Sequence, residues 1–195
     1  MQIGKIVKSN TQLDYVCQVD NPGEQSTCPS PQDYAFGTFV RLELPAAGDY
    51  LVGLVYTTML MNPEFGSLGP RLSPASDLEV FSPDYLREQA TLVGIVAVGQ
   101  VTRAGGVHQG VPRLAASVNA AVQTMSPAEV RTFHDTSNSP ALAYAPLLLA
   151  QGDRLMPHLL LHVVDQLGQL FPGCERQLSV LRGNLAWKAA VVPAG

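Results

Sequence analysis

Apolar and polar residues alternate along the first hundred residues in the manner of short β-strands separated by turns. The clearest run is Val40–Leu44, in which apolar residues occupy every second position and Arg41 and Glu43 lie between them. Strict alternation indicates a strand with one buried face and one solvent-exposed face. Ala47-Gly48-Asp49 then forms a turn, and we expect a hairpin between this strand and the apolar run Tyr50–Met61.

Four further segments have the composition of strands. Ala90–Val101 is almost entirely apolar, which is typical of a strand buried on both faces. The other three strands are predicted at Gln2–Val7, Leu13–Val19 and Leu114–Met125. The glycine-rich segment Gly105–Pro112 is expected to be a surface loop.

Helical signals begin at Ser126. The sequence Ser126-Pro127-Ala128-Glu129 combines a capping box with proline at the first helical position, and this helix should end near His134. Further helices are predicted at Ala141–Gln151, Leu155–Phe171 and Glu175–Val191. Strands followed by helices predict an α+β protein, with a β domain at residues 1–122 and a C-terminal helical bundle at residues 123–195.

A Pro- and Gly-rich insertion occupies residues 62–85, between two of the predicted strands. Its aromatic residues Phe65 and Phe81 are candidates for contact with the β domain or with a partner. Arg71 is the single basic residue of the insertion. We expect Arg71 either to pair with an acidic residue of the insertion or to contact a partner. The acidic candidates are Glu64, Asp77 and Glu79.

The charge content is unusually low. Only 14% of the 195 residues are charged, against about 25% in ordinary soluble domains, while 46% are hydrophobic. A chain with so few charges is expected to cover part of its surface with a partner, and we expect a homo-oligomer. Because the third and fourth helices are apolar over more than half of their circumference, we predict that the helical region supplies the contact to another subunit. Trp187, the only tryptophan, is a candidate contact residue there.

Charge distribution and cysteine content exclude other classes. Residues 1–100 carry five basic and eleven acidic side chains, and no Lys/Arg cluster is present, so we expect no direct binding of nucleic acid. No run of about 18 apolar residues and no N-terminal leader is visible, which predicts a cytoplasmic protein that does not enter a membrane. Cys17, Cys28 and Cys174 lack metal or redox spacing and are expected to be thiols, with a Cys17–Cys28 disulfide as the minor alternative.

Three short glycine-centred motifs follow one another in the β region. They are Ile3-Gly4-Lys5-Ile6-Val7, Phe36-Gly37-Thr38-Phe39-Val40 and Leu51-Val52-Gly53-Leu54-Val55. In this order they resemble the HAS barrel, the small β-barrel that opens HerA-type DNA-translocating ATPases and the subunits of rotary ATP synthases. The resemblance covers roughly residues 1–102 and implies a small six-stranded antiparallel β-barrel.

The chain departs from that family after the barrel. A HerA-type enzyme continues into an ATPase domain with the phosphate-binding sequence G-x-x-x-x-G-K-[S/T], which this chain lacks. Residues 105–110 are the nearest glycine-rich segment, and they have no lysine. The resemblance therefore implies a stand-alone, non-enzymatic assembly module without a cofactor, possible partners being other copies of itself and a separate HerA-type ATPase.

Two other functions compete with this interpretation. His158, His162 and Asp165 follow one another at i, i+4 and i+7 of the third helix, a spacing that allows a metal site and hence a metal-dependent hydrolase. The same residues also fit the polar stripe of an ordinary amphipathic helix, which we favour. A small-ligand-binding barrel covered by residues 62–85 is the other alternative. His134 is placed in a loop, and Ser126, His134 and Asp135 do not have the arrangement of a catalytic triad.

Overall fold

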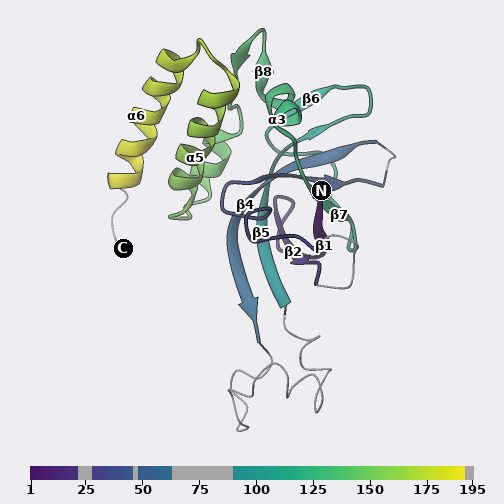
Figure 1. The fold of residues 1–195 in the computed structure, drawn as a ribbon. Helices are drawn as coiled ribbons and strands as arrows, with labels where there is room; N and C mark the ends of the chain where they lie inside the picture. The colour runs from purple at the N-terminus through teal and green to yellow at the C-terminus, as the bar shows by residue number, and fades with distance from the viewer. Residues whose placement is uncertain (22–27, 46–47, 63–89, 192–195) are drawn as a thin grey trace, which may run out of the picture.

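The computed structural model describes residues 1–21, 28–45, 48–62 and 90–191 (Figure 1). The strands are β1 (Gln2–Ser9), β2 (Asp14–Val19), β3 (Phe39–Glu43), β4 (Tyr50–Met61), β5 (Ala90–Val101), β6 (Val107–Gln109), β7 (Ala121–Thr124), β8 (Asp135–Thr136) and β9 (Ser139–Pro140). The helices are α3 (Pro127–His134), α4 (Ala145–Ala150), α5 (Met156–Leu170) and α6 (Glu175–Val191). None of these described helices is both long and apolar enough to cross a membrane.

Six antiparallel strands close into a barrel. The strand order is β2-β1-β7-β3-β4-β5, and pairing of β2 with β5 closes the ring. The hairpin predicted between Val40–Leu44 and Tyr50–Met61 is present as β3 and β4. The expected α+β fold, a six-stranded antiparallel barrel followed by helices, is confirmed.

Apolar side chains fill the interior of the barrel. Val40, Leu42 and Leu44 are buried there, as their alternation with Arg41 and Glu43 predicted. Side chains from the other strands complete this core, and most of them are fully buried. The members of this interior core are Ile3, Ile6, Tyr15, Cys17, Val19, Val40, Leu42, Leu44, Leu51, Val55, Val93, Ile95, Ala97 and Val122.

A second core lies between the outer wall of the barrel and the helices. Phe39, Leu54 and Val98 face outward from the barrel and pack into one cluster with buried residues of α3, α4 and α5. Helix α6 packs on α5 through Leu178 and Leu185. In Figure 1 the helices stand together on one side of the barrel, with α6 as the outermost helix. The barrel and the helices therefore share a core that neither could bury alone.

The N-terminus of α3 is joined to the barrel by polar contacts. Ser126 and Glu129 form the predicted capping box, in which the Ser126 backbone N–H donates to Glu129 Oε2 at 2.7 Å. Arg41 on β3 donates from Nη1 to Glu129 Oε1 at 2.9 Å. The hydrogen bonds from Ser126 and the charge of Arg41 lower the pKa of Glu129, although burial acts in the opposite direction. One carboxylate thus caps α3 and anchors it to β3.

Several short elements differ from the sequence predictions. The expected loop at Gly105–Pro112 contains β6, which pairs with the end of β5. The predicted strand at Leu114–Met125 is reduced to β7, and the predicted helix at Ala141–Gln151 is reduced to α4. The two-residue strands β8 and β9 had no counterpart in the prediction. Each of these elements is too short for a periodic pattern to predict it.

Candidate interaction surfaces

The polar stripe of α5 contacts the barrel and α6. His158 and His162 are exposed, whereas Asp165 accepts a hydrogen bond from Nε of Arg182 on α6 at 2.8 Å. His162 also lies against the ring of Phe36, with 6.4 Å between ring centroids. Within the described residues, no group of three or more His, Cys, Asp or Glu side chains is placed to hold a metal ion. The contacts of His162 and Asp165 are therefore those of the polar face of an amphipathic helix.

Gly37 allows α5 to approach the barrel closely. Its φ of 83° lies in the left-handed region, which side chains with a Cβ rarely adopt. A Cβ atom at this position would overlap the ring of His162. Gln166 donates from Nε2 to the carbonyl oxygen of Gly37 at 3.1 Å. The second glycine motif of the sequence thus forms part of the junction between barrel and helices.

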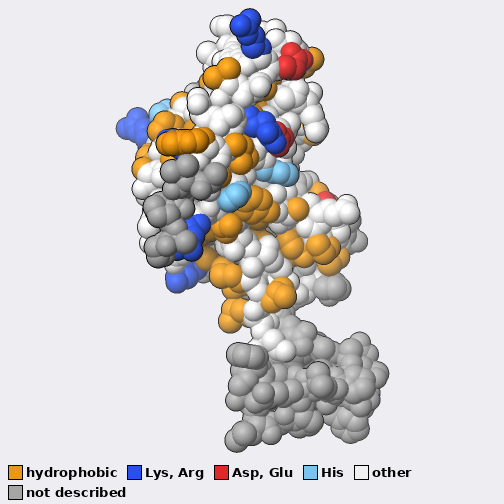
Figure 2. All heavy atoms as spheres, turned by 90° about the vertical axis from the view of Figure 1, so that its left-hand side faces the viewer, with side chains coloured by type: hydrophobic (Ala, Val, Ile, Leu, Met, Phe, Trp, Pro, Cys, Tyr) orange, Lys and Arg blue, Asp and Glu red, His pale blue; other side chains and the backbone are white. Residues whose placement is uncertain are grey.

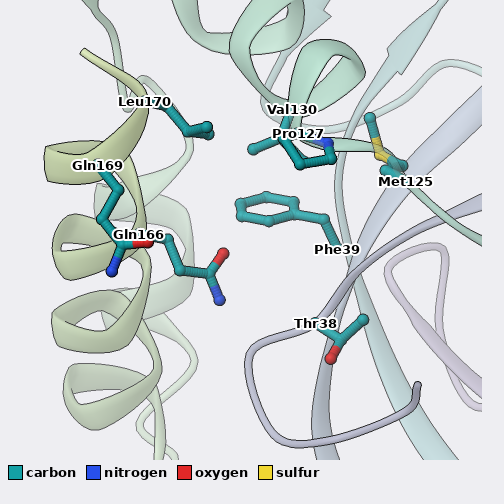
Figure 3. A pocket seen from close by; sticks show the side chains of 8 residues that line it. All are labelled: Thr38, Phe39, Met125, Pro127, Val130, Gln166, Gln169 and Leu170. Carbon is teal, nitrogen blue, oxygen red and sulfur yellow. The ribbon is translucent and has the colours of Figure 1, made fainter. Parts of the chain in front are cut away.

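A cavity of about 240 Å³ opens next to this junction (Figure 3). In Figure 3 Phe39 points toward the space between α3 and α5, and Gln166 reaches toward it from α5. The cavity lies outside the barrel, whose interior is filled by side chains. Its lining residues are Thr38, Phe39, Met125, Pro127, Val130, Gln166, Gln169 and Leu170. They include no ionisable side chain, so the cavity offers no charged group for acid–base chemistry.

His134 is fully buried at the end of α3, which corrects its expected position in a loop. Its Nδ1 donates to the carbonyl oxygen of Val130 at 2.8 Å, and its Nε2 accepts from the hydroxyl of Tyr144 at 2.9 Å. Phe39 and Phe133 contact the ring edge to face. Burial lowers the pKa of His134 to about 4 and raises that of Tyr144. Both ring nitrogens are engaged within the core, so the role of His134 is structural.

The outer face of α6 is the exposed apolar part of the helical region. Val180 and Trp187 are seven residues apart, and their side chains remain 64% and 66% exposed. They lie on the side of α6 opposite to the residues that pack on α5, since 3.6 residues make one turn. Arg176, which is also exposed, lies on the same side. Figure 2 shows basic and hydrophobic side chains next to one another in the upper part of this view of the molecule.

The wide apolar surface of α5, in contrast, is covered by other parts of the same chain. Its buried residues pack against the barrel wall on one side and α6 on the other. The surplus apolar surface that predicted a contact with another subunit is therefore restricted to α6. Among the remaining candidate residues, Phe65, Arg71 and Phe81 lie outside the described residues.

A second exposed apolar segment lies at the end of β4. Met59, Leu60 and Met61 are 41%, 81% and 57% exposed. They belong to the part of β4 that extends with β5 beyond the body of the barrel, toward the bottom of Figure 1. Hydrophobic side chains also gather in the lower part of the face in Figure 2, just above the grey atoms. We call residues Thr57–Met61 the β4 extension.

The fold and these surfaces define a class of protein: a closed six-stranded barrel with helices packed on one side, whose candidate sites are exposed apolar surfaces on α6 and on β4. More specifically, the chain belongs to the family described as a domain of unknown function (DUF8166), whose family model matches residues 1–194. No curated protein matches the sequence.

Proposed function

We propose that this protein is a non-enzymatic interaction and assembly module that binds a separately encoded HerA-type DNA-translocating ATPase. The proposal rests mainly on the exposure of Trp187 on the outer face of α6. An exposed tryptophan flanked by another large apolar residue is characteristic of protein interaction sites, because burial of such side chains supplies much of the binding free energy. The proposal includes no cofactor.

The positive charge on the outer face of α6 favours a partner other than a second α6. Arg176 lies one turn before Val180 on the same side of the helix. A second copy would present the same positive charge, and like charges across an interface are unfavourable. A partner with acidic residues around an apolar pocket would complement this face. We therefore assign α6 to the contact with a different chain.

The barrel supports the choice of partner class. Of the three glycine-centred motifs that carry the resemblance to the HAS barrel, the first lies in β1, the second leads into β3 and the third lies in β4 of the closed six-stranded antiparallel ring. Gly37 of the second motif lies directly beneath α5, so the motif takes part in docking another element on the barrel wall. We infer that the barrel acts as an assembly unit. The cytoplasmic location remains part of this proposal, supported by three free cysteines.

The substitution Trp187→Ala tests the proposal. We expect wild-type protein immobilised on beads to retain, from an extract of its source cells, a chain that carries the phosphate-binding sequence G-x-x-x-x-G-K-[S/T]. Trp187→Ala is expected to reduce its retention at least about tenfold, since loss of a central interface tryptophan costs about 2 kcal/mol or more. Mass spectrometry identifies and quantifies the retained chain.

Leu114→Ala provides the matched control, because Leu114 is a large hydrophobic residue of comparable exposure on a different part of the surface. This variant should retain the partner as wild type does. The proposal is wrong if no chain with an ATPase sequence is retained, or if Trp187→Ala and Leu114→Ala retain it equally. Circular dichroism of both variants checks that the fold is preserved.

A further inference from the structure

The β4 extension has an open strand edge. One edge of β4 pairs with β5 along its whole length, from Tyr50 opposite Val101 to Met61 opposite Ala90. The other edge pairs with β3 only as far as Leu54, and hydrogen bonds to the segment before β3 continue the ladder to Val55. Beyond that point, no described residue pairs with this edge.

The residues of the β4 extension do not themselves provide the features that normally prevent strands from pairing between molecules. Exposed edges are usually protected by charged side chains, proline or a covering element. The β4 extension consists of Thr57, Thr58, Met59, Leu60 and Met61, with no charge and no proline. Its last four residues are all exposed. An extended, uncharged edge with apolar side chains is a template for a further strand.

We propose that the β4 extension pairs in antiparallel orientation with the β4 extension of a second copy of this chain. The inference rests on the assembly role proposed above, but it concerns a different surface from α6. The two extensions would form a continuous sheet across a two-fold axis, which joins the β4–β5 ribbons of both molecules. Each strand would then satisfy the open N–H and C=O groups of the other.

The character of the edge favours a second copy as the occupant. An isologous contact requires a surface that is complementary to itself. An uncharged strand meets this condition, because antiparallel pairing brings no like charges together. Alternate residues of a strand lie on the same face, so Met59 and Met61 of one copy would contact the same residues of the other. The unbranched methionine side chains adapt readily to such a contact.

The contrast with α6 supports this assignment. The outer face of α6 carries Arg176, which disfavours pairing with a second α6, whereas the β4 extension carries no charge. The low charge content of the chain, 14%, is in part explained if this uncharged segment is covered in the dimer.

The substitution Leu60→Lys places a charge on the exposed edge, and in a dimer whose two-fold axis passes near Leu60 the two lysines would face each other. We expect wild-type protein to dimerise in sedimentation velocity experiments at micromolar concentration, and Leu60→Lys to weaken the dimer at least about tenfold. Because Leu60 is 81% exposed, the melting temperature should change little. Val118→Lys, at a residue that is 67% exposed elsewhere, should leave the dimer intact.

Disulfide cross-linking tests the geometry independently. Antiparallel pairing about a two-fold axis brings equivalent residues of the two copies together at the axis. In a background with Cys28→Ser and Cys174→Ser, single cysteines are introduced at each position from Thr58 to Met61. We expect rapid formation of a covalent dimer at one or two adjacent positions and none with Val118→Cys.

The two proposals can fail separately. The β4 pairing is wrong if the wild-type protein is monomeric at all concentrations. It is also wrong if Leu60→Lys dimerises as wild type does and, in addition, no cysteine in the β4 extension forms a cross-link. Retention of the ATPase chain would still support the role of α6 in that case. Conversely, Trp187→Ala should leave the β4 dimer unchanged, and loss of the dimer in this variant alone would assign self-association to α6 and overturn the inference.

Discussion

Acidification from pH 6.5 to pH 4 is expected to lower the free energy of unfolding by about 3 kcal/mol through His134 alone. The pKa of this residue is about 4 in the folded protein, whereas its ordinary value is 6.5. Between these values the unfolded chain binds more protons than the folded one, so stability falls as the pH falls. Above pH 6.5 the full contribution is present. Urea unfolding at a series of pH values measures this dependence.

The hydrogen bonds of His134 explain why protonation is unfavourable. Nδ1 already donates to the carbonyl oxygen of Val130, so Nε2 is the remaining site for a proton. Nε2 accepts the hydroxyl hydrogen of Tyr144, which is itself fully buried. A proton on Nε2 would force the Tyr144 hydroxyl to become the acceptor and would place a positive charge among aromatic rings.

His134→Phe isolates this effect, since it retains a ring of similar size but cannot titrate. We expect it to cost about 1 to 3 kcal/mol at pH 7, because the Tyr144 hydroxyl loses its partner, and to show a much weaker acid dependence. The carboxylates contribute equally to the pH dependence of unfolding in both proteins. The difference in pH dependence between wild type and His134→Phe therefore reports the contribution of His134. His158→Gln, at an exposed histidine of α5, should keep the acid dependence of wild type. Equal pH dependence in wild type and His134→Phe would contradict the prediction.

Gly4→Ala is expected to destabilise the protein by about 2 to 3 kcal/mol. Gly4 lies on β1 opposite Val19 of β2, and a Cβ atom there would overlap the backbone oxygen of Gln18. It would also come within 2.9 Å of Cys17 Sγ. Because a backbone atom cannot move aside without disturbing the β1–β2 ladder, the closed barrel must distort. Thermal and urea unfolding measure the loss.

Gly168→Ala is the matched control. Gly168 lies in α5, and nothing is within 4 Å of the position that its Cβ would occupy. Alanine favours the helix over glycine, so this variant should be slightly more stable than wild type, by about 0.5 kcal/mol. If Gly4→Ala were as stable as Gly168→Ala, close packing of β1 on β2 would not be the reason for glycine in the first motif.

The strands predicted with the correct bounds are those in which a long run of apolar residues marks the strand directly. Tyr50–Met61 and Ala90–Val101 have the predicted bounds, because long apolar runs ending at polar or turn residues define a strand directly. The predicted start of α3 is also correct, since a capping box acts within a few residues. The short strands β6, β8 and β9 pair with segments only a few residues away, but each has only two or three residues, which is too few for an alternating pattern to indicate a strand.

The candidate surfaces were only partly predictable. Trp187 was identified as the single tryptophan of an apolar helix, and its exposure agrees with a contact role that has yet to be tested. His134 was placed in a loop because the helix that begins at Pro127 was expected to end near it, and nothing in the local sequence indicates that Tyr144 buries its ring. The open edge of β4 was likewise not predicted, since an unpaired edge is a property of the neighbouring strands rather than of β4 itself.

The sequence by itself determined the α+β class, the order of strands followed by helices, and the scarcity of charge. The first two properties follow from the alternation of apolar and polar residues and from helix caps, which act over a few residues. The third is a matter of composition, which is a property of the whole chain. Only the tertiary structure decided which apolar surface remains exposed. The barrel wall and α6 cover α5, whereas β3 begins opposite Leu54 and therefore does not pair with the β4 extension. Exposure is decided by how the elements pack, which local patterns do not specify.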